Sequence, residues 1–237
     1  KVLEHVVDVI LYLEGDRQQT YRLLRCHKNR FSTTQAIGLF EMKEAGMIEI
    51  QQPSEFFIES LSLTHPGSII TPILEGNRVL LVELQALVVK SGYGMSKRTF
   101  VGVNSHRATL IVAAIDKYFH CKIAEHDVFL NIIGGLKVAE PALDLGIIVA
   151  ILSSLLNVPL TKKVALVGEV ALTGELRSVP QMKLRCIECM KMGFESIVIP
   201  EKSRHKELND IDIKIIYAKD IKEVIADLFE DAIPKKQ

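Results

Sequence analysis

Residues 68–76 read SIITPILEG and residues 78–89 read RVLLVELQALVV, and both are apolar runs rich in β-branched side chains. Runs of this length and composition are typical of β-strands. Downstream of them, the hydrophobic period switches repeatedly between that of a helix and that of a strand. The expected helices cover residues 106–119, 141–156, 181–192 and 221–229, and the expected strands cover residues 128–132, 164–170, 196–200 and 213–218. This alternation predicts an α/β domain.

The beginning of the chain has a different pattern, in which short apolar runs are joined by turn-forming residues. Ser54 can cap a brief helix that extends to Ser60, and the polar stretch LTHPGS at residues 63–68 has the composition of a domain boundary. We therefore expect two domains, residues 1–64 and residues 65–237, in a mixed α/β (α+β) fold. The runs of the first domain predict antiparallel strands at residues 6–14, 21–28, 37–42 and 47–51.

The overall composition is that of an ordinary globular protein, with 48% hydrophobic and 24% charged residues among 237. Lys plus Arg and Asp plus Glu both number 29, so binding to nucleic acid must come from local clusters of charge. The longest apolar stretch, residues 145–156, is shorter than the roughly 20 residues that a membrane span requires. Because the chain starts at Lys1 within a strand-like run, without a signal sequence, we expect a fragment of a soluble, cytoplasmic protein that does not bind membranes.

The cysteines give little support for a metal site. Cys186 and Cys189 form a CxxC, but neither a second cysteine pair nor a histidine partner lies at zinc-site spacing from them. Their separation by three residues within a helical pattern favours two partly buried thiols of a reduced cytosolic protein.

A cation pair follows one of the early strand candidates. Residues 26–32 read CHKNRFS, and Lys28 and Arg30 lie one residue apart with no acidic residue before Glu41. If the chain stays extended through Lys28, the two side chains point to the same side, about 6.6 Å apart along the strand. Two such cations could bind one polyanion, although a solvated basic loop would have the same spacing.

The cation pair lies in a stretch that resembles a known family. Residues 21–32, YRLLRCHKNRFS, with the strands that follow and PSEFFIES at residues 53–60, resemble the end of the ATPase core of the RadA (also called Sms) family, bacterial DNA-repair relatives of RecA. The family signature Lys-Asn-Arg-Phe-Gly is matched by Lys28, Asn29, Arg30, Phe31 and Ser32. The resemblance continues through residues 66–88, 127–135, 140–145, 168–179 and 192–201.

This resemblance implies a hexameric, ATP-driven motor that acts on single-stranded and branched DNA and works with the RecA recombinase. Residues 1–64 would be the carboxy-terminal part of its RecA-like ATPase domain. Lys28 and Arg30 would reach the ATP of a neighbouring subunit, where such groups supply about 10³–10⁵ in rate. ATP and Mg²⁺ are the cofactors that the family implies for the intact protein, and zinc is expected only in its amino-terminal four-cysteine module.

Two departures from the family pattern limit what this chain can do alone. Ser32 replaces the family glycine, and a left-handed conformation would cost a non-glycine residue about 1–2 kcal/mol. The phosphate-binding pattern GxxxxGK[ST] does not occur in the sequence, so we expect no ATP hydrolysis by these residues alone.

The second half resembles the proteolytic domain of the Lon family, which has the ribosomal protein S5 domain 2-like fold. In Lon a serine near a helix start is the nucleophile and a lysine from a later helix activates it. The serine position falls on Ala142 and the lysine position on Lys183, so peptide hydrolysis is effectively excluded.

The residues around the two protease positions also have purely structural interpretations. Pro141 suits a first helical position, and Glu140 and Asp144 would offset the helix dipole. Lys183 could simply solvate the outer face of a helix together with Arg185 and Lys191.

Two windows of sequence, residues 17–40 and 84–115, contain nine Lys or Arg residues and no Asp or Glu. The loop SGYGMSKRTF at residues 91–100 adds glycines and aromatic residues around its cations, a composition suited to contact with a phosphate backbone. A solvated hairpin tip would have the same composition. The predicted DNA-binding residues are Lys90, Lys97, Arg98 and Arg107.

Three functions remain open from the sequence. The first is part of a DNA-repair motor that drives branch migration or unwinding of recombination intermediates. The second is a ring-assembly and DNA-docking scaffold without enzymatic activity, and the third, disfavoured by Ala142, is a Lon-type serine–lysine peptidase.

Overall fold

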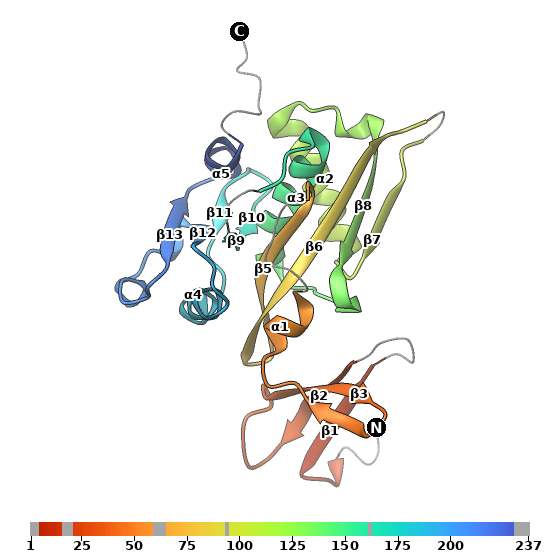
Figure 1. Cartoon of the computed structure of the whole chain (residues 1–237), viewed down its shortest axis with the longest axis vertical. Coiled ribbons are helices and arrows are strands. Elements are labelled where there is room, and N and C mark those ends of the chain that lie inside the picture. Colours follow the sequence, from red (N-terminus) through yellow and green to blue (C-terminus); the bar gives the residue numbers. More distant parts are fainter. Residues whose placement is uncertain (1–4, 16–20, 59–64, 93–94, 161–162, 230–237) are drawn as a thin grey trace.

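The computed structural model describes residues 5–15, 21–58, 65–92, 95–160 and 163–229, which form two sheets of different size (Figure 1). The smaller sheet lies at one end of the molecule, and helix α1 (Pro53–Phe57) lies between it and the larger sheet. The expected domain boundary after residue 64 falls at residues outside those described.

The smaller sheet is an antiparallel meander, as the early apolar runs predict. Its four strands follow one another in space in the order of the sequence. They are β1 (Val9–Glu14), β2 (Tyr21–Asn29), β3 (Ile37–Lys43) and β4 (Gly46–Glu49). A bulge in β2 shifts the register, because Leu11 pairs with Cys26 whereas Ile10 pairs with Lys28.

Helix α1 exists as expected, but Ser54 does not cap it. The cap position is Gln52, and Ser54 is buried within the helix. The Ser54 hydroxyl donates to Glu188 at 2.5 Å and accepts from the backbone N–H of Leu81 at 3.2 Å. The side chain therefore joins α1 to the larger sheet and to a later helix, which a local capping rule does not foresee.

The larger sheet has seven strands in the order β13-β12-β9-β5-β6-β8-β7. The β5–β6 and β6–β8 pairs are antiparallel, and the other pairs are parallel, which confirms the mixed α/β class. The strands are β5 (Ser68–Glu75), β6 (Arg78–Lys90), β7 (Arg98–Val101), β8 (His126–Ile132), β9 (Val164–Leu166), β12 (Ser196–Pro200) and β13 (Lys214–Ala218), and β10 (Glu169–Val170) and β11 (Leu176–Arg177) form a separate ribbon.

Four longer helices pack on this sheet close to the predicted positions. They are α2 (Ser105–Phe119), α3 (Asp144–Leu156), α4 (Met182–Lys191) and α5 (Ile221–Leu228). Short 3-10 turns accompany them as η2 (Ile123–Glu125), η3 (Ile133–Gly135), η4 (Pro141–Leu143), η5 (Glu201–Ser203) and η6 (Lys206–Leu208).

Helix α3 is the centre of the core, because it contacts α2, β5 and β6 and its residues 144–153 are all buried. Its two serines are hydrogen-bonded to the ends of the β5–β6 hairpin. The hydroxyl oxygen of Ser153 accepts from the N–H of Gly67 at 2.9 Å, and that of Ser154 accepts from the N–H of Val88 at 3.0 Å.

Cys186 and Cys189 are fully buried in α4, more so than the sequence suggests. Burial raises the pKa of both thiols, that of Cys186 to about 11, so they remain protonated at neutral pH. Within the described ranges, no three His, Cys, Asp or Glu side chains are grouped to hold a metal ion. None of the helices among those residues is long and apolar enough to cross a bilayer.

Candidate functional site

The cation pair lies at the end of β2, beyond its last pairing with β3. Arg25 and Ile37 are the last residues that β2 and β3 pair with each other, and we call residues 26–36, which include the end of β2 and its connection to β3, the basic loop. Pairing with β1 keeps β2 extended through Asn29, and the N–H of Arg30 donates to the carbonyl oxygen of Asp8 at 3.1 Å. The extended conformation assumed for Lys28 is therefore present.

The side chain of Asn29 shapes the tip of the basic loop. Its Oδ1 accepts hydrogen bonds from the N–H of Phe31 at 2.9 Å and of Ser32 at 3.2 Å. Side chains of this type replace a backbone acceptor in tight turns. Ser32 is not among the residues with positive φ, so the strain expected from losing the family glycine does not arise.

The tip is open to solvent. Phe31 is 79% exposed, and the side chain of Arg30 is 60% exposed. Arg30 forms an ion pair with Asp8, with Nη1 and Oδ1 2.9 Å apart. An exposed pair of this kind contributes only about 0–1 kcal/mol, so a more highly charged anion could replace Asp8.

The segment that matches the protease serine position is buried, in contrast to the exposed tip of the basic loop. Ala142 lies in η4 and its side chain is completely buried, whereas Lys183 in α4 is exposed. A side chain at position 142 therefore faces the core rather than a substrate.

The charged residues beside these positions hold the core together. Arg185 is fully buried, and its guanidinium forms an ion pair with Glu140 and donates to the carbonyl oxygens of Pro72 at 2.5 Å and Pro180 at 2.9 Å. Glu140 also accepts from the N–H of Leu74 at 2.7 Å. The expectation that Arg185 solvates the outer face of α4 is wrong, because the helix turns it toward β5.

Asp144 is likewise anchored by tertiary contacts. It is 1% exposed, forms an ion pair with Arg107 and accepts from the N–H of Val170 at 2.9 Å. Burial raises the pKa of Asp144, while the hydrogen bond to Asp144 raises the pKa of Arg107. Dipole compensation was thus an incomplete explanation for Glu140 and Asp144, since each holds an arginine from another helix.

The four predicted DNA-binding cations fall into two groups. Lys90 and Lys97 are exposed. Arg98 donates to the carbonyl oxygens of Lys97 at 3.0 Å, Ile123 at 2.9 Å and His126, and burial lowers its pKa. Because Arg107 is bound to Asp144, both arginines are engaged within the fold.

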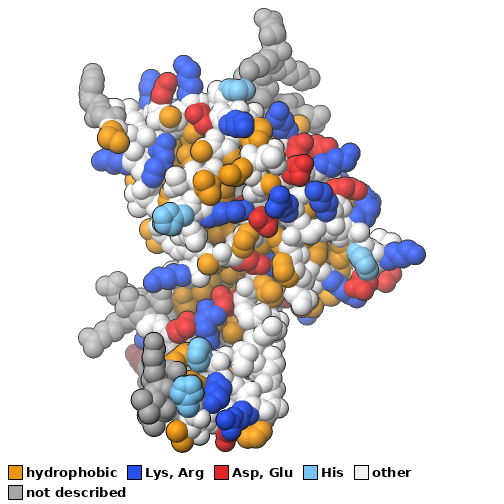
Figure 2. Space-filling view, turned by 180° about the vertical axis from the view of Figure 1, so that it is seen from behind, with side chains coloured by type: hydrophobic (Ala, Val, Ile, Leu, Met, Phe, Trp, Pro, Cys, Tyr) orange, Lys and Arg blue, Asp and Glu red, His pale blue; other side chains and the backbone are white. Residues whose placement is uncertain are grey.

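Acidic side chains from elsewhere in the sequence lie close to the acid-free window of residues 84–115 in the folded structure. The carboxylate of Asp127 accepts from the hydroxyl of Ser91 at 2.6 Å and from the N–H of Lys97 at 2.7 Å. These bonds, that from Ser91 first, hold the pKa of Asp127 below its usual value. Lys and Arg side chains are accordingly interspersed with Asp and Glu on the face in Figure 2. Tyr93, in the same loop, lies outside the described residues.

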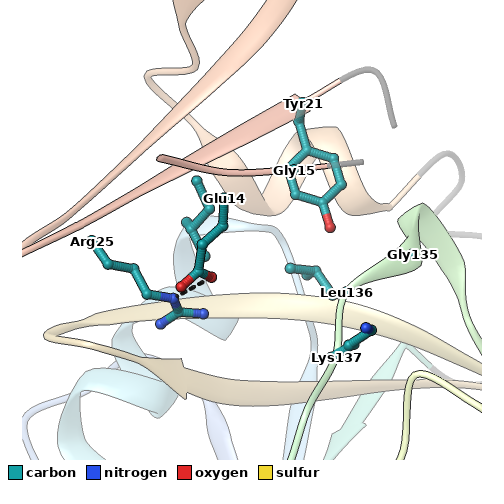
Figure 3. A pocket seen from close by; sticks show the side chains of 8 residues that line it. Glu14, Gly15, Tyr21, Arg25, Gly135, Leu136 and Lys137 are labelled. Atoms are coloured by element: carbon teal, nitrogen blue, oxygen red, sulfur yellow. Dashed lines mark hydrogen bonds and ion pairs between the residues drawn. The ribbon is translucent and has the colours of Figure 1, made fainter. Parts of the chain in front are cut away.

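A crevice that the sequence did not predict lies between the smaller sheet and the segment that follows β8 (Figure 3). Its volume is about 400 Å³. Arg25 and Glu14 form an ion pair on one side, and the hydroxyl of Tyr21 points into the space above Leu136 and Lys137. These residues come from segments more than 100 positions apart, so no local pattern could indicate the crevice. It is lined by Glu14, Gly15, Tyr21, Leu23, Arg25, Gly135, Leu136 and Lys137.

A DNA repair protein RadA from Halalkalibacterium halodurans is 43% identical over 203 residues, which cover 86% of this chain and 44% of the relative. The chain is similar to DNA repair protein RadA over most of its length. The RadA of Bacillus subtilis is 42% identical over 200 residues, covering 84% and 44%, and that of Streptococcus pneumoniae is 40% identical over 229 residues, covering 97% and 54%.

The RadA resemblance inferred from the motifs is thereby confirmed, and the chain spans about half the length of the RadA relatives, in their carboxy-terminal part. Residues 92–203 also match the family described as subunit ChlI of Mg-chelatase. That match is consistent with the predicted Lon-like α/β domain.

Proposed function

We propose that this chain is the carboxy-terminal part of a RadA-type DNA-repair ATPase, in which the basic loop acts on ATP bound by a neighbouring subunit of a hexameric ring. The observation that carries the proposal is the exposed tip, where Arg30 forms a weak surface ion pair with Asp8 and Phe31 is 79% exposed. An apolar ring beside an exchangeable cation suits a contact between subunits.

The chemistry assigned to Lys28 and Arg30 is electrostatic. Bound ATP with Mg²⁺ would supply the phosphoryl group that is transferred, and the two cations would stabilise the charge that develops on it. The phosphate-binding loop must come from another part of the intact protein, because this sequence has none.

We assign the Lon-like domain to assembly and DNA contact. Ala142 is buried and lacks a nucleophilic atom, so a peptidase function is not proposed. Lys90 and Lys97 remain the candidates for contact with single-stranded or branched DNA, in branch migration or unwinding alongside the RecA recombinase. The protein would act in the bacterial cytoplasm, and zinc would belong only to an amino-terminal module of the intact protein.

Mixed rings of the full-length protein test whether the basic loop acts in trans. Arg30→Ala should reduce ATP turnover by about 10³-fold while leaving nucleotide binding intact. Adding a subunit with a disabled phosphate-binding loop should restore part of the turnover, at interfaces that join an intact loop to an intact Arg30. Arg204→Ala is the matched control, because Arg204 has similar exposure and an exposed partner in Glu201. Mixed rings without recovery would contradict action in trans.

The competing function is a scaffold without enzymatic activity, and the protection of Glu140, Asp144 and Arg185 inside the core is compatible with it. If the protein were only a scaffold, Arg30→Ala would change neither ATP turnover nor assembly. The same measurement therefore separates the two functions.

A further inference from the structure

The base of the basic loop is held by the larger sheet. Strand β5 is the middle strand of the seven, and it turns into β6 through Gly76 and Asn77. We call residues 75–78 the hairpin turn. This turn makes one contact just before the basic loop, with Arg25, and one within it after the KNRFS motif, with Gln35.

The contact before the motif is an ion pair between the sheets. Arg25, which ends the β2–β3 pairing, binds Glu75 at the end of β5 through Nη1 and Glu14 through Nε at 2.8 Å. The side chain of Glu75 is 14% exposed and that of Arg25 is 33% exposed. The hydrogen bond to Glu75 is the main cause of the raised pKa of Arg25. This pair is better shielded from solvent than the pair of Arg30 and Asp8.

The contact after the motif is made by the backbone. The N–H of Asn77 donates to the carbonyl oxygen of Gln35 at 2.8 Å. Gly76 has φ +59°, and a Cβ at this position would overlap the Gln35 carbonyl oxygen and lie 2.7 Å from Ile37. Only glycine combines this conformation with so close an approach.

Aromatic packing stiffens the same junction. Tyr21 at the start of β2 is 5% exposed, and its ring centroid lies 5.3 Å from that of Phe57 and 6.1 Å from that of Phe56, both in α1. Edge-on pairs of this kind add about 0.5–1.5 kcal/mol beyond the burial of area. Strand β2 is thus attached to α1 at its start and to the larger sheet at Arg25.

We propose that the hairpin turn is the positioning element of the basic loop, with Glu75 and Arg25 as positioning residues that set where Arg30 lies. The inference rests on the proposed function of Arg30. A loop of residues 26–36 fixed at both ends has far fewer accessible conformations than one fixed by the meander alone. The larger sheet, through this turn, then determines whether Arg30 reaches the neighbouring nucleotide.

The test compares kcat and KM for ATP in the full-length protein carrying Gly76→Ala or Glu75→Gln. A misplacement of about 1 Å lowers turnover by about 10²-fold, so kcat should fall about 10- to 100-fold with KM unchanged. Gly193→Ala is the matched control for Gly76, because Gly193 has φ +74° and no atom within 4 Å of an added Cβ. Glu175→Gln is the control for Glu75, because Glu175 forms an exposed pair with Lys202.

A positioning role also predicts a specific dependence on Arg30. In an Arg30→Ala background, Glu75→Gln should lower kcat no further, since both changes remove the same interaction. Reversing the pair with Arg25→Glu and Glu75→Arg, in a Glu14→Gln background so that position 25 meets no second carboxylate, should restore kcat relative to either single variant in that background. Amide hydrogen exchange of residues 26–36 should be faster in Gly76→Ala than in Gly193→Ala, a result that needs no activity.

The outcomes separate this inference from the proposed function. If Arg30→Ala leaves turnover unchanged, the proposed function fails, whatever the hairpin turn does. If Arg30→Ala abolishes turnover while Gly76→Ala and Glu75→Gln match their controls in both kcat and exchange, the proposed function stands and the positioning role is overturned.

Discussion

The basic loop and the segment of residues 140–144 both match family motifs, but the fold treats their charges in opposite ways. The side chain of Arg30 in the loop is 60% exposed, and among the residues that the structure describes it pairs with the exposed Asp8. Glu140 and Asp144 are each bound by an arginine from another helix and by a backbone N–H of another strand. A charge whose partners are fully supplied by the fold has no capacity left for a ligand. The comparison therefore separates a motif whose cation is exposed and weakly paired from one whose charges are bound within the fold.

The largest effect on stability is expected from Arg185→Ala. This change removes a fully buried guanidinium and leaves the Glu140 carboxylate, which is only 18% exposed, without its cation, which costs about 3–5 kcal/mol. Chemical denaturation of this chain measures the loss. Because the single variant could fail to fold, the double variant Arg185→Met with Glu140→Leu is the companion, and it should recover most of the stability. A loss below 1 kcal/mol for Arg185→Ala would remove the contrast with Arg30.

A smaller loss is expected from Ala142→Ser. The new hydroxyl would enter a fully buried position and should cost about 1–3 kcal/mol. It should not react with an activity-based serine probe, because solvent and probe do not reach it. Strong labelling of Ala142→Ser, compared with the unmodified chain, would show that this segment is still an open active site.

Lys97 and Arg98 extend the comparison to DNA binding. Lys97→Ala should lower the slope of log affinity against log salt concentration by about 0.7–0.9, the lower value applying to single strands. Arg98→Ala should leave the slope unchanged and reduce stability instead, because its guanidinium bonds to backbone carbonyls. Binding at several salt concentrations measures both slopes. Equal slopes for Lys97→Ala and the unmodified chain would contradict a contact between Lys97 and DNA.

The smallest effect is a pH dependence from Asp127. Its folded-state pKa lies below the usual 3.8, so it contributes stability above that value and loses it as pH falls through the folded-state pKa. The stability difference between the unmodified chain and Asp127→Asn should be constant from about pH 5 to 7 and shrink below about pH 4. Urea unfolding at several pH values provides the measurement. A difference that grows on acidification would contradict the assigned hydrogen bonds.

Much of the fold was predictable because its signals are local. Alternating periods gave α2, α3, α4 and α5 within a few residues, and short apolar runs gave the meander. The position of the KNRFS motif at the end of a strand was predictable for the same reason. The sequence wrongly predicted that Ser54 caps α1 and that Arg185 is solvated, because the true contacts of both side chains depend on which element packs against their helix.

The acid-free windows show most directly which features are determined by the sequence and which are determined by the tertiary structure. The sequence alone determined most strands and the longer helices, the cations and the replacement of a nucleophile by Ala142, but it did not predict β7, which begins within the expected loop at residues 91–100. Only the tertiary structure decided the partners of the cations, since Arg30 pairs with an acid 22 residues away, Arg107 with one 37 away and Arg25 with one 50 away. Secondary structure follows from contacts over a few residues, whereas the charge that a side chain meets depends on chain segments that only folding brings together.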